Sequence, residues 1–172
     1  MNVSILNLLP IKQGGDAKDA INAAVRLAKF AEDIGINRYW VAEHHNMQNL
    51  ASSATQLIIA YILEHTKSLR VGSGGVMLPN HSPYSIAEQY ATLETLFPNR
   101  VDLGLGRAPG TDQDTAAVLR RGAREIEFDM QINELMDYFN AKRAVKAYPK
   151  VDKIPPIYIL GSSIYSAYVA AE

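Results

Sequence analysis

The sequence predicts an α/β protein of the (β/α)8 TIM-barrel type, apparently incomplete, with about five strand–helix units in a single domain over residues 1–172. Short apolar runs alternate with amphipathic helical stretches along the chain. Strands separated by helices imply a parallel sheet with helical crossovers. The G-x-G-x-x-G fingerprint of a dinucleotide-binding unit is absent after the first strand. A full barrel needs eight strands and typically about 250 residues. An open sheet completed by another chain is the alternative.

The first half of the chain contains three predicted strands, each followed by a helix. Apolar residues recur at helical spacing over residues 17–34, and Gly35 suits the position just past a helix end. Ser82 followed by Pro83 is typical of a helix start. Strands are expected at 3–9, 38–42 and 69–78, and helices at 17–34, from a cap at Ser52 or Ser53, and after Ser82.

The second half adds two predicted strands, at residues 100–108 and 155–163. A loop rich in glycine and aspartate follows the first of them, and a helical pattern then runs from about 124 to 145. A last helix is expected from residue 163, and the chain ends inside it. We interpret this ending as a truncation of the gene or of the chain.

The composition excludes several classes of function. Hydrophobic residues make up 48% and charged residues 20%, which is typical of a soluble globular protein. The net charge of −1 comes without a basic stripe, so neither nucleic acid nor a membrane surface is an expected partner. No cysteine is present, which removes disulfides and fits a reducing compartment. We therefore expect a cytoplasmic protein.

The segment YWVAEHHNM places polar side chains directly after a predicted buried strand. Catalytic groups of barrels gather where strands end in loops. His44 is therefore a candidate general acid or base, with a histidine bonded to a backbone carbonyl as the structural alternative. Alternation along a strand places Glu43 and His45 on one side and His44 on the other. We expect no metal site, because sequential residues rarely ligate one ion and no H-x-H or H-E-x-x-H spacing occurs.

The segment GSGG interrupts an otherwise apolar strand. Glycines weaken a strand unless a backbone or a ligand must approach closely. A flat ring lying against Gly74 and Gly75 would need this absence of side chains. A β-bulge at a barrel corner explains the same glycines equally well.

Two later segments are suited to an anion. Arg107 follows the fourth strand, and a guanidinium group suits a phosphate or carboxylate. Ser162, Ser163 and Ser166 lie at the start of the last helix, where free backbone amides favour an anion, although simple capping is the commoner use. In a closed or nearly closed barrel, both could contact one phosphate. Together with the glycines they suggest a phosphorylated cofactor with a flat ring, and flavin mononucleotide (FMN) fits.

The segments YWVAEHHNM, LRVGSGGVMLPNHSPYSIAEQ, RVDLGLGRAPGTD and PPIYILGSS resemble the bacterial luciferase-like flavin monooxygenase family. The similarity runs from the first strand to Glu172 and is weakest over residues 116–153. The resemblance implies a (β/α)8 barrel, usually dimeric, that uses reduced FMN and O₂ to oxygenate a small organic substrate such as an aldehyde. A separate flavin reductase is a possible source of the reduced FMN. Other branches of the family use the deazaflavin F420.

The resemblance also implies roles for individual residues. His44 corresponds to the catalytic histidine, and Arg107 to a phosphate-contacting arginine. Gly74 and Gly75 correspond to a pair that packs under the flavin ring, often across a non-proline cis peptide. Ser162, Ser163 and Ser166 correspond to the segment that touches the ribityl chain and phosphate. Gly106 stands where luciferase carries a cysteine, so bioluminescence is not implied.

Three functions remain open at this point. The first is a flavin-dependent monooxygenase, or the N-terminal portion of one. The second is a shortened-barrel protein that binds flavin without turnover, and the third is an F420-dependent dehydrogenase. A homodimer is expected, because an incomplete barrel leaves unpaired sheet edges. Its contacts are expected on the helices after the second and third strands, at Leu57, Ile58, Tyr61, Ile62, Ile86, Tyr90 and Leu93.

Overall fold

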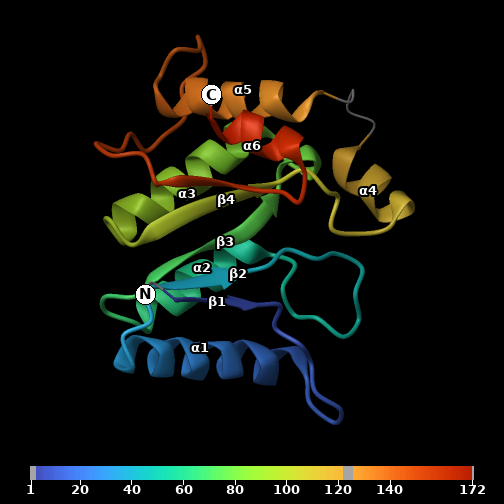
Figure 1. The fold of residues 1–172 in the computed structure, drawn as a ribbon, viewed down its shortest axis with the longest axis vertical. Coiled ribbons are helices and arrows are strands. Elements are labelled where there is room, and N and C mark those ends of the chain that lie inside the picture. The colour runs from blue at the N-terminus through green and yellow to red at the C-terminus, as the bar shows by residue number, and fades with distance from the viewer. Residues whose placement is uncertain (1–2, 122–125, 172) are drawn as a thin grey trace.

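The computed structural model describes residues 3–121 and 126–171 of the chain. Its centre is one parallel sheet of five strands in the order β1-β2-β3-β4-β5 (Figure 1). The predicted parallel order of the strands is therefore confirmed, and all carboxyl ends lie at the same edge of the sheet. The strands are Ser4–Asn7 (β1), Arg38–Val41 (β2), Arg70–Met77 (β3), Val101–Gly106 (β4) and Ile157–Leu160 (β5).

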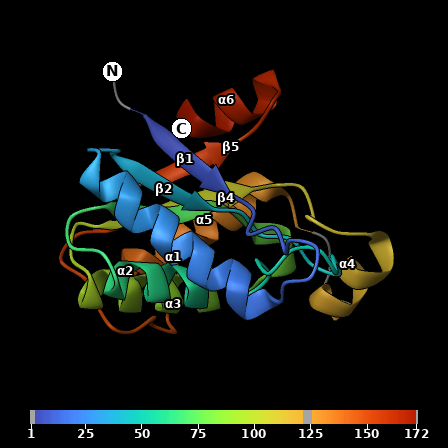
Figure 2. The ribbon, with the colours of Figure 1, turned by 90° about the horizontal axis from the view of Figure 1, so that it is seen from below.

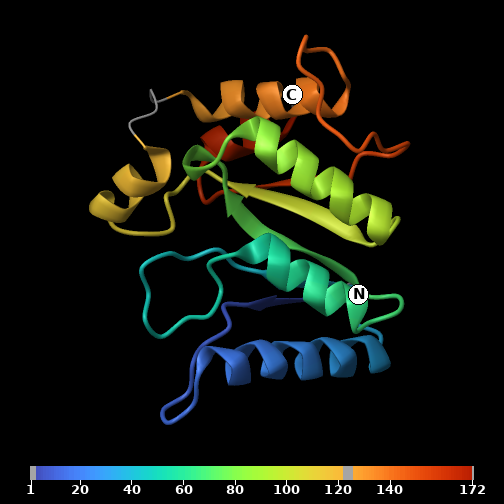
Figure 3. The same ribbon diagram turned by 180° about the vertical axis from the view of Figure 1, so that it is seen from behind.

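Helices cover mainly one face of this sheet. Figure 3 shows α2 and α3 in front of the strands, with α1 and α5 beside them toward the two ends of the sheet, and α5 packs against α3. The last helix, α6, packs against β5 and lies on the other side of the strands from α1–α3 in Figure 2. The helices are Ala17–Asp33 (α1), Thr55–Glu64 (α2), Pro83–Leu96 (α3), Gln113–Arg120 (α4), Phe128–Phe139 (α5) and Ile164–Ala171 (α6), with a 3₁₀ turn at Leu78–Asn80 (η1). None of the helices in the described ranges is long and apolar enough to cross a bilayer.

The two ends of helix α1 can be explained by its local sequence. The Asp16 carboxylate accepts the backbone N–H of Asp19 at 2.8 Å, and the two aspartates form a capping box. The helix ends before Gly35, whose φ of +77° is readily adopted by glycine. Between these ends, the buried residues of the helix are the small or short Ala20, Ala24, Val25, Ala28 and Ala31.

The prediction of one long helix over residues 124–145 is wrong. Helix α4 forms inside the predicted loop, because the Asp112 carboxylate accepts the backbone N–H of Thr115 at 2.9 Å and caps its first turn. Helix α5 then ends at Phe139, and Ala141 adopts a φ of +53°, which breaks the helical path. The expected start at residues 124–125 lies outside the described residues.

The two faces of the sheet differ in burial. Residues such as Val41, Val71 and Leu103 point toward the helices and are fully buried. On the opposite, inner face, the Leu6 side chain is 55% exposed. The ring centroids of Trp40 and Tyr158 lie 5.1 Å apart on this face, although two strands separate β2 from β5. The inner face is therefore concave, and small residues of β3 and β4 lie beneath the two rings.

Most of the expected dimer-contact residues are part of the core of this chain. Leu57 and Tyr61 stay exposed, at 73% and 41%. An apolar stripe on a helix is thus largely explained here by packing on the sheet. The residues of that set that are buried in the core are Ile58, Ile62, Ile86, Tyr90 and Leu93.

Candidate active site

Most of the polar side chains singled out from the sequence lie at the carboxyl edge of the sheet. His44 follows the end of β2, and Arg107 follows the end of β4. Between them, β3 runs into η1 and the loop before α3. Because barrel enzymes build their sites at this edge, it is the natural place for catalysis.

His44 is held by its backbone, while one nitrogen of its ring stays without a partner. Its backbone N–H donates to the Ser52 carbonyl at 2.9 Å, and the Ser52 hydroxyl donates to the Ala42 carbonyl. Ser52 therefore fixes the backbone after β2 through these two hydrogen bonds. The N-cap of α2, which was predicted at Ser52 or Ser53, is Ala54. The Nδ1 atom of His44 is buried and has no hydrogen-bond partner among the described residues. Buried polar atoms normally have a hydrogen-bond partner, so this imidazole nitrogen is suited to form a hydrogen bond with a bound ligand.

Glu43 lies at the centre of a buried hydrogen-bond cluster. Its Oε1 atom is 2.9 Å from Nε2 of His45 and 2.7 Å from Nε2 of His81, and its Oε2 accepts the Met77 backbone N–H at 3.3 Å. Burial favours the neutral acid, but the hydrogen bonds and charges of His81 and His45 together outweigh it and lower the pKa of Glu43. Glu43 and His45 thus share one side, as the strand alternation predicted.

His81 was not among the candidate site residues predicted from the sequence. This residue lies 38 positions after Glu43, in the loop between η1 and α3. Glu43, His45 and His81 each offer one ligand atom, and these atoms lie within 4.8 Å of one another. The short-range spacings that predicted no metal site do not include His81, so this set is visible only in the fold.

Gly74 and Gly75 form a non-proline cis peptide, as the family resemblance implied, inside a register shift of the β3–β4 pairing. The β-bulge, which was the alternative explanation for these glycines, is therefore present. A Cβ at Gly74 would lie 2.9 Å from the Trp40 Cβ, and one at Gly75 would lie 2.9 Å from the carbonyl oxygen of Gly104. Packing within the sheet already requires both glycines, and their contact with a flavin ring stays a prediction.

Arg107 lies beside the start of α6. Its guanidinium carbon is 5.0 Å from the centroid of the Tyr165 ring, and the side chain makes no ion pair with described residues. The Ser163 carbonyl accepts the Ser166 backbone N–H at 3.2 Å in the first turn. Ser162 and Ser163 are exposed, and Ser166 is half-buried. The structure thus brings Arg107 and the predicted anion-binding turn together.

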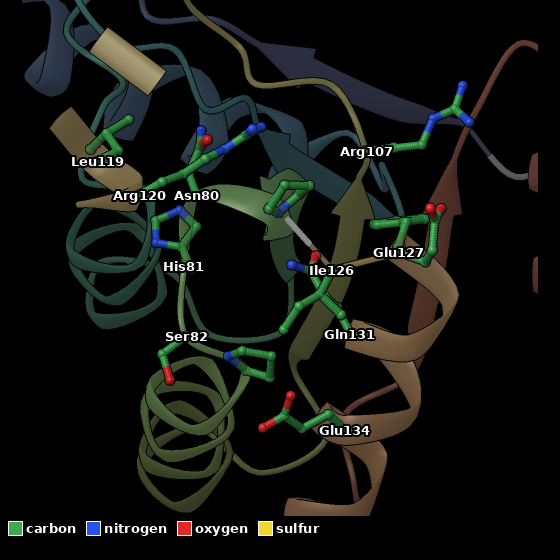
Figure 4. Close-up of a pocket in the computed structure, with 13 residues that line it drawn as sticks. Asn80, His81, Ser82, Arg107, Leu119, Arg120, Ile126, Glu127, Gln131 and Glu134 are labelled. Carbon is green, nitrogen blue, oxygen red and sulfur yellow. The ribbon is translucent and has the colours of Figure 1, made fainter. Parts of the chain in front are cut away.

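A cavity of about 490 Å³ opens between η1, the start of α3, α4 and α5 (Figure 4). His81 lies on its wall, so the cavity adjoins the Glu43 cluster. Gln131 on α5 is buried, and its Oε1 has no partner among the described residues. A volume of this size suits a small organic molecule.

A family model described as luciferase-like monooxygenase matches residues 1–172. The chain is 49% identical to a luciferase-like monooxygenase of Escherichia coli strain K12, over 98% of this chain and 52% of that protein. It is 39% identical to the N-acetyl-S-alkylcysteine monooxygenase of Bacillus subtilis strain 168, over 100% of this chain and 54% of that protein. The chain spans about half the length of the curated relatives it matches.

Solved structures agree with the predicted fold. The chain matches apo-MsnO8 with a TM-score of 0.91 and 34% identity, over 99% of this chain and 52% of that one. Two further matches lie below 25% identity and show only a shared fold. A Baeyer–Villiger monooxygenase from Pseudomonas putida in complex with FMN matches with a TM-score of 0.73 and 16% identity, over 92% of this chain and 51% of that one. An F420-dependent secondary alcohol dehydrogenase matches with a TM-score of 0.73 and 18% identity, over 98% of this chain and 55% of that one. The incomplete-barrel class is thereby confirmed.

Proposed function

The chain belongs to the luciferase-like monooxygenase family, and we propose that it forms the FMN-binding part of a flavin-dependent monooxygenase that oxygenates a small organic substrate. The observation that carries the proposal is the unpartnered, buried Nδ1 of His44 at the carboxyl edge of the sheet. On the inner face, the apolar surfaces of Leu6 and Trp40 suit a flat ring. Arg107, without an ionic partner among the described residues, suits the phosphate.

Bound reduced FMN would supply two electrons to O₂, so that one oxygen atom enters the substrate and the other leaves as water. The residues of this chain position and protect that reaction. Arg107 and the first turn of α6 hold the phosphate, with contributions from Ser162, Ser163 and Ser166. His44 holds or moves a proton through Nδ1, and the backbone bond to Ser52 keeps its main chain in place.

A deazaflavin is the second candidate cofactor. The likeness to the F420-dependent alcohol dehydrogenase supports it, because that enzyme shares the fold. FMN is favoured because the relatives above 30% identity with a named activity are monooxygenases. The third candidate, a flavin-binding protein without turnover, would bind FMN but leave O₂ and substrate unchanged, unlike a monooxygenase or a dehydrogenase.

We also propose the partners expected from the sequence. The substrate is a small molecule, the reduced FMN comes from a separate reductase, and the setting is the cytoplasm. The exposed Leu57 and Tyr61 on α2 support a homodimer through this helix. In relatives about twice as long, the remaining length would add further flavin and substrate contacts.

Two alanine variants separate the proposed roles of His44 and Arg107. His44→Ala should slow O₂-dependent oxidation of bound reduced FMN by about 10²–10⁴, the usual contribution of a general acid or base, with FMN affinity kept within a few fold. Arg107→Ala should weaken FMN binding by about 1.5–3 kcal/mol, the value of a charge-assisted hydrogen bond. FMN titration and stopped-flow oxidation measure the two effects.

The matched controls are His65→Ala, which removes a histidine from the end of α2, and Arg26→Ala, which removes an exposed arginine from α1. Both should leave binding and oxidation unchanged. Loss of FMN binding in His44→Ala with normal binding in Arg107→Ala would show that the assigned roles are wrong. Tight FMN binding with no O₂-dependent turnover in the unmodified chain would favour the non-enzymatic alternative.

A further inference from the structure

We propose that Glu43, His45 and His81 form a binding site for one zinc-class divalent metal ion. This inference is independent of the proposed flavin chemistry. It rests on the convergence of two imidazole nitrogens on one carboxylate oxygen, at 2.9 Å and 2.7 Å. All three ligand atoms lie within 4.8 Å of one another.

The donor set suits zinc. Two histidines and one glutamate, with a fourth position left for water, form a known type of zinc site. Metal–ligand bonds of about 2.0–2.2 Å in a tetrahedral site place ligand atoms about 3.4 Å apart. The oxygen–nitrogen distances in the cluster therefore need to lengthen by only about 0.5–0.7 Å, which small imidazole rotations can supply. Magnesium, which prefers oxygen ligands in octahedral geometry, does not suit this set.

The glutamate is already held in place for such a role. Glu43 is fully buried, and its Oε2 accepts the Met77 backbone N–H at 3.3 Å, which leaves Oε1 directed at the two histidines. Supporting contacts of this kind orient metal ligands and fix their geometry. The backbone of His45 is fixed as well, because its N–H donates to the Gly110 carbonyl at 3.2 Å.

An ion can reach this cluster. The side chains of His45 and His81 are 14% and 23% exposed, whereas the Glu43 side chain is 1% exposed. His81 also lies on the wall of the 490 Å³ cavity (Figure 4). The open coordination position would therefore face solvent from the histidine side, and the buried carboxylate would supply the negative charge.

Bound metal would tie together segments far apart in the sequence. Glu43 and His45 follow β2, and His81 follows β3 and η1. Because Glu43 and His45 flank His44, an ion here would also restrict the backbone on both sides of the proposed catalytic histidine. The occupied site would stabilise the folded chain by mass action, since the ligands converge only in the fold.

Titration of ZnCl₂ into the EDTA-treated and dialysed chain, followed by calorimetry, tests the proposal. We expect one ion per chain with micromolar or tighter affinity, a raised thermal midpoint, and no comparable response to MgCl₂. His45→Ala and His81→Ala should each weaken zinc binding at least tenfold. His65→Ala, which removes a histidine outside the cluster, should change it less than twofold. CoCl₂ as a spectroscopic probe should give the visible absorption of a tetrahedral nitrogen–oxygen site.

The variants are checked by circular dichroism and thermal unfolding. If His81→Ala does not fold, His81→Asn takes its place, because asparagine can still donate a hydrogen bond to Glu43 but is a poor zinc ligand. Absence of saturable one-to-one zinc binding would overturn the proposal. It would also be overturned if His65→Ala weakened binding as much as His45→Ala and His81→Ala.

Discussion

Two buried carboxylates, one at each end of the sheet, are stabilised in different ways. Asp102 lies near the amino ends of the strands, where its Oδ2 accepts hydrogen bonds from Nε of Arg38 at 3.1 Å and Nε of Arg70 at 3.0 Å. Glu43 lies at the carboxyl edge, where its partners are two imidazoles and a backbone amide. Both side chains are 1% exposed. The ends therefore differ in the chemistry of the partners and not in burial.

This difference in hydrogen-bond partners distinguishes a structural amino end of the sheet from a functional carboxyl edge. Guanidinium groups stay charged at any physiological pH, and the hydrogen bonds that Arg70 donates to the Asp102 carboxylate raise the pKa of Arg70 further. Imidazoles, in contrast, can exchange protons and bind metals. A permanent ion cluster at the amino end and a reactive cluster at the carboxyl end match the division of roles in barrel enzymes.

The largest effect is expected at the amino end. Asp102→Ala should lower the free energy of unfolding by about 3 kcal/mol, because it leaves two partly buried guanidinium groups without a counter-ion. Urea unfolding measures this loss. The control is Asp137→Ala, which breaks a surface pair with Arg143 and should cost less than about 1 kcal/mol. Equal losses in the two variants would remove the basis for treating Asp102 as a structural centre.

A smaller loss is expected at the carboxyl edge. Glu43→Gln should lower the free energy of unfolding by about 1–3 kcal/mol, because the amide loses the charge-assisted bonds to His45 and His81. Chemical denaturation in the presence of EDTA isolates this loss from any metal effect. A cost above that of Asp102→Ala would reverse the comparison and make the carboxyl edge the main structural centre.

The smallest effect is expected at an acidic side chain on the helix side, Glu32. Burial opposes its ionisation, but hydrogen bonds from the backbone of Ser68, Leu69 and Lys67 outweigh it and lower the pKa of Glu32 to about 2. A folded-state pKa below the ordinary value stabilises the fold above about pH 4.5, and this contribution is lost as pH falls toward 2.

Glu32→Gln should therefore destabilise the chain at pH 7 by no more than about 1 kcal/mol. The difference from the unmodified chain should shrink progressively between about pH 4.5 and pH 2. Unfolding curves across this range measure it, with Asp33→Asn, the next residue along α1, as control. A difference that grows on acidification would contradict the assigned direction of the pKa shift.

The order of the strands could be predicted, because alternating apolar runs and helices leave few topologies open. The segment after β4 could not be predicted in the same way. Asp112 was part of a stretch typical of a loop, and only its bond to the Thr115 backbone shows that it starts α4. The early end of α5 likewise depends on the positive φ of Ala141, which no local sequence rule requires.

The candidate site could be predicted in part. The pairing of Glu43 with His45 follows from strand alternation alone. The contact with His81 does not, because it depends on the path of β3, η1 and the following loop in three dimensions. The signal available in the sequence was a histidine shortly after the next strand, and it becomes informative only when neighbouring strand ends are considered together.

The most direct test of the functional carboxyl edge is hydrogen–deuterium exchange of the chain with and without saturating FMN. We expect slower exchange in loops at the carboxyl edge and in the first turn of α6, over residues 42–46, 106–110 and 161–166. Exchange should stay unchanged in loops at the amino end, over residues 34–37, 65–69 and 97–100. Protection at the amino end, or no protection at the carboxyl edge under saturating FMN, would contradict a flavin site at the carboxyl edge.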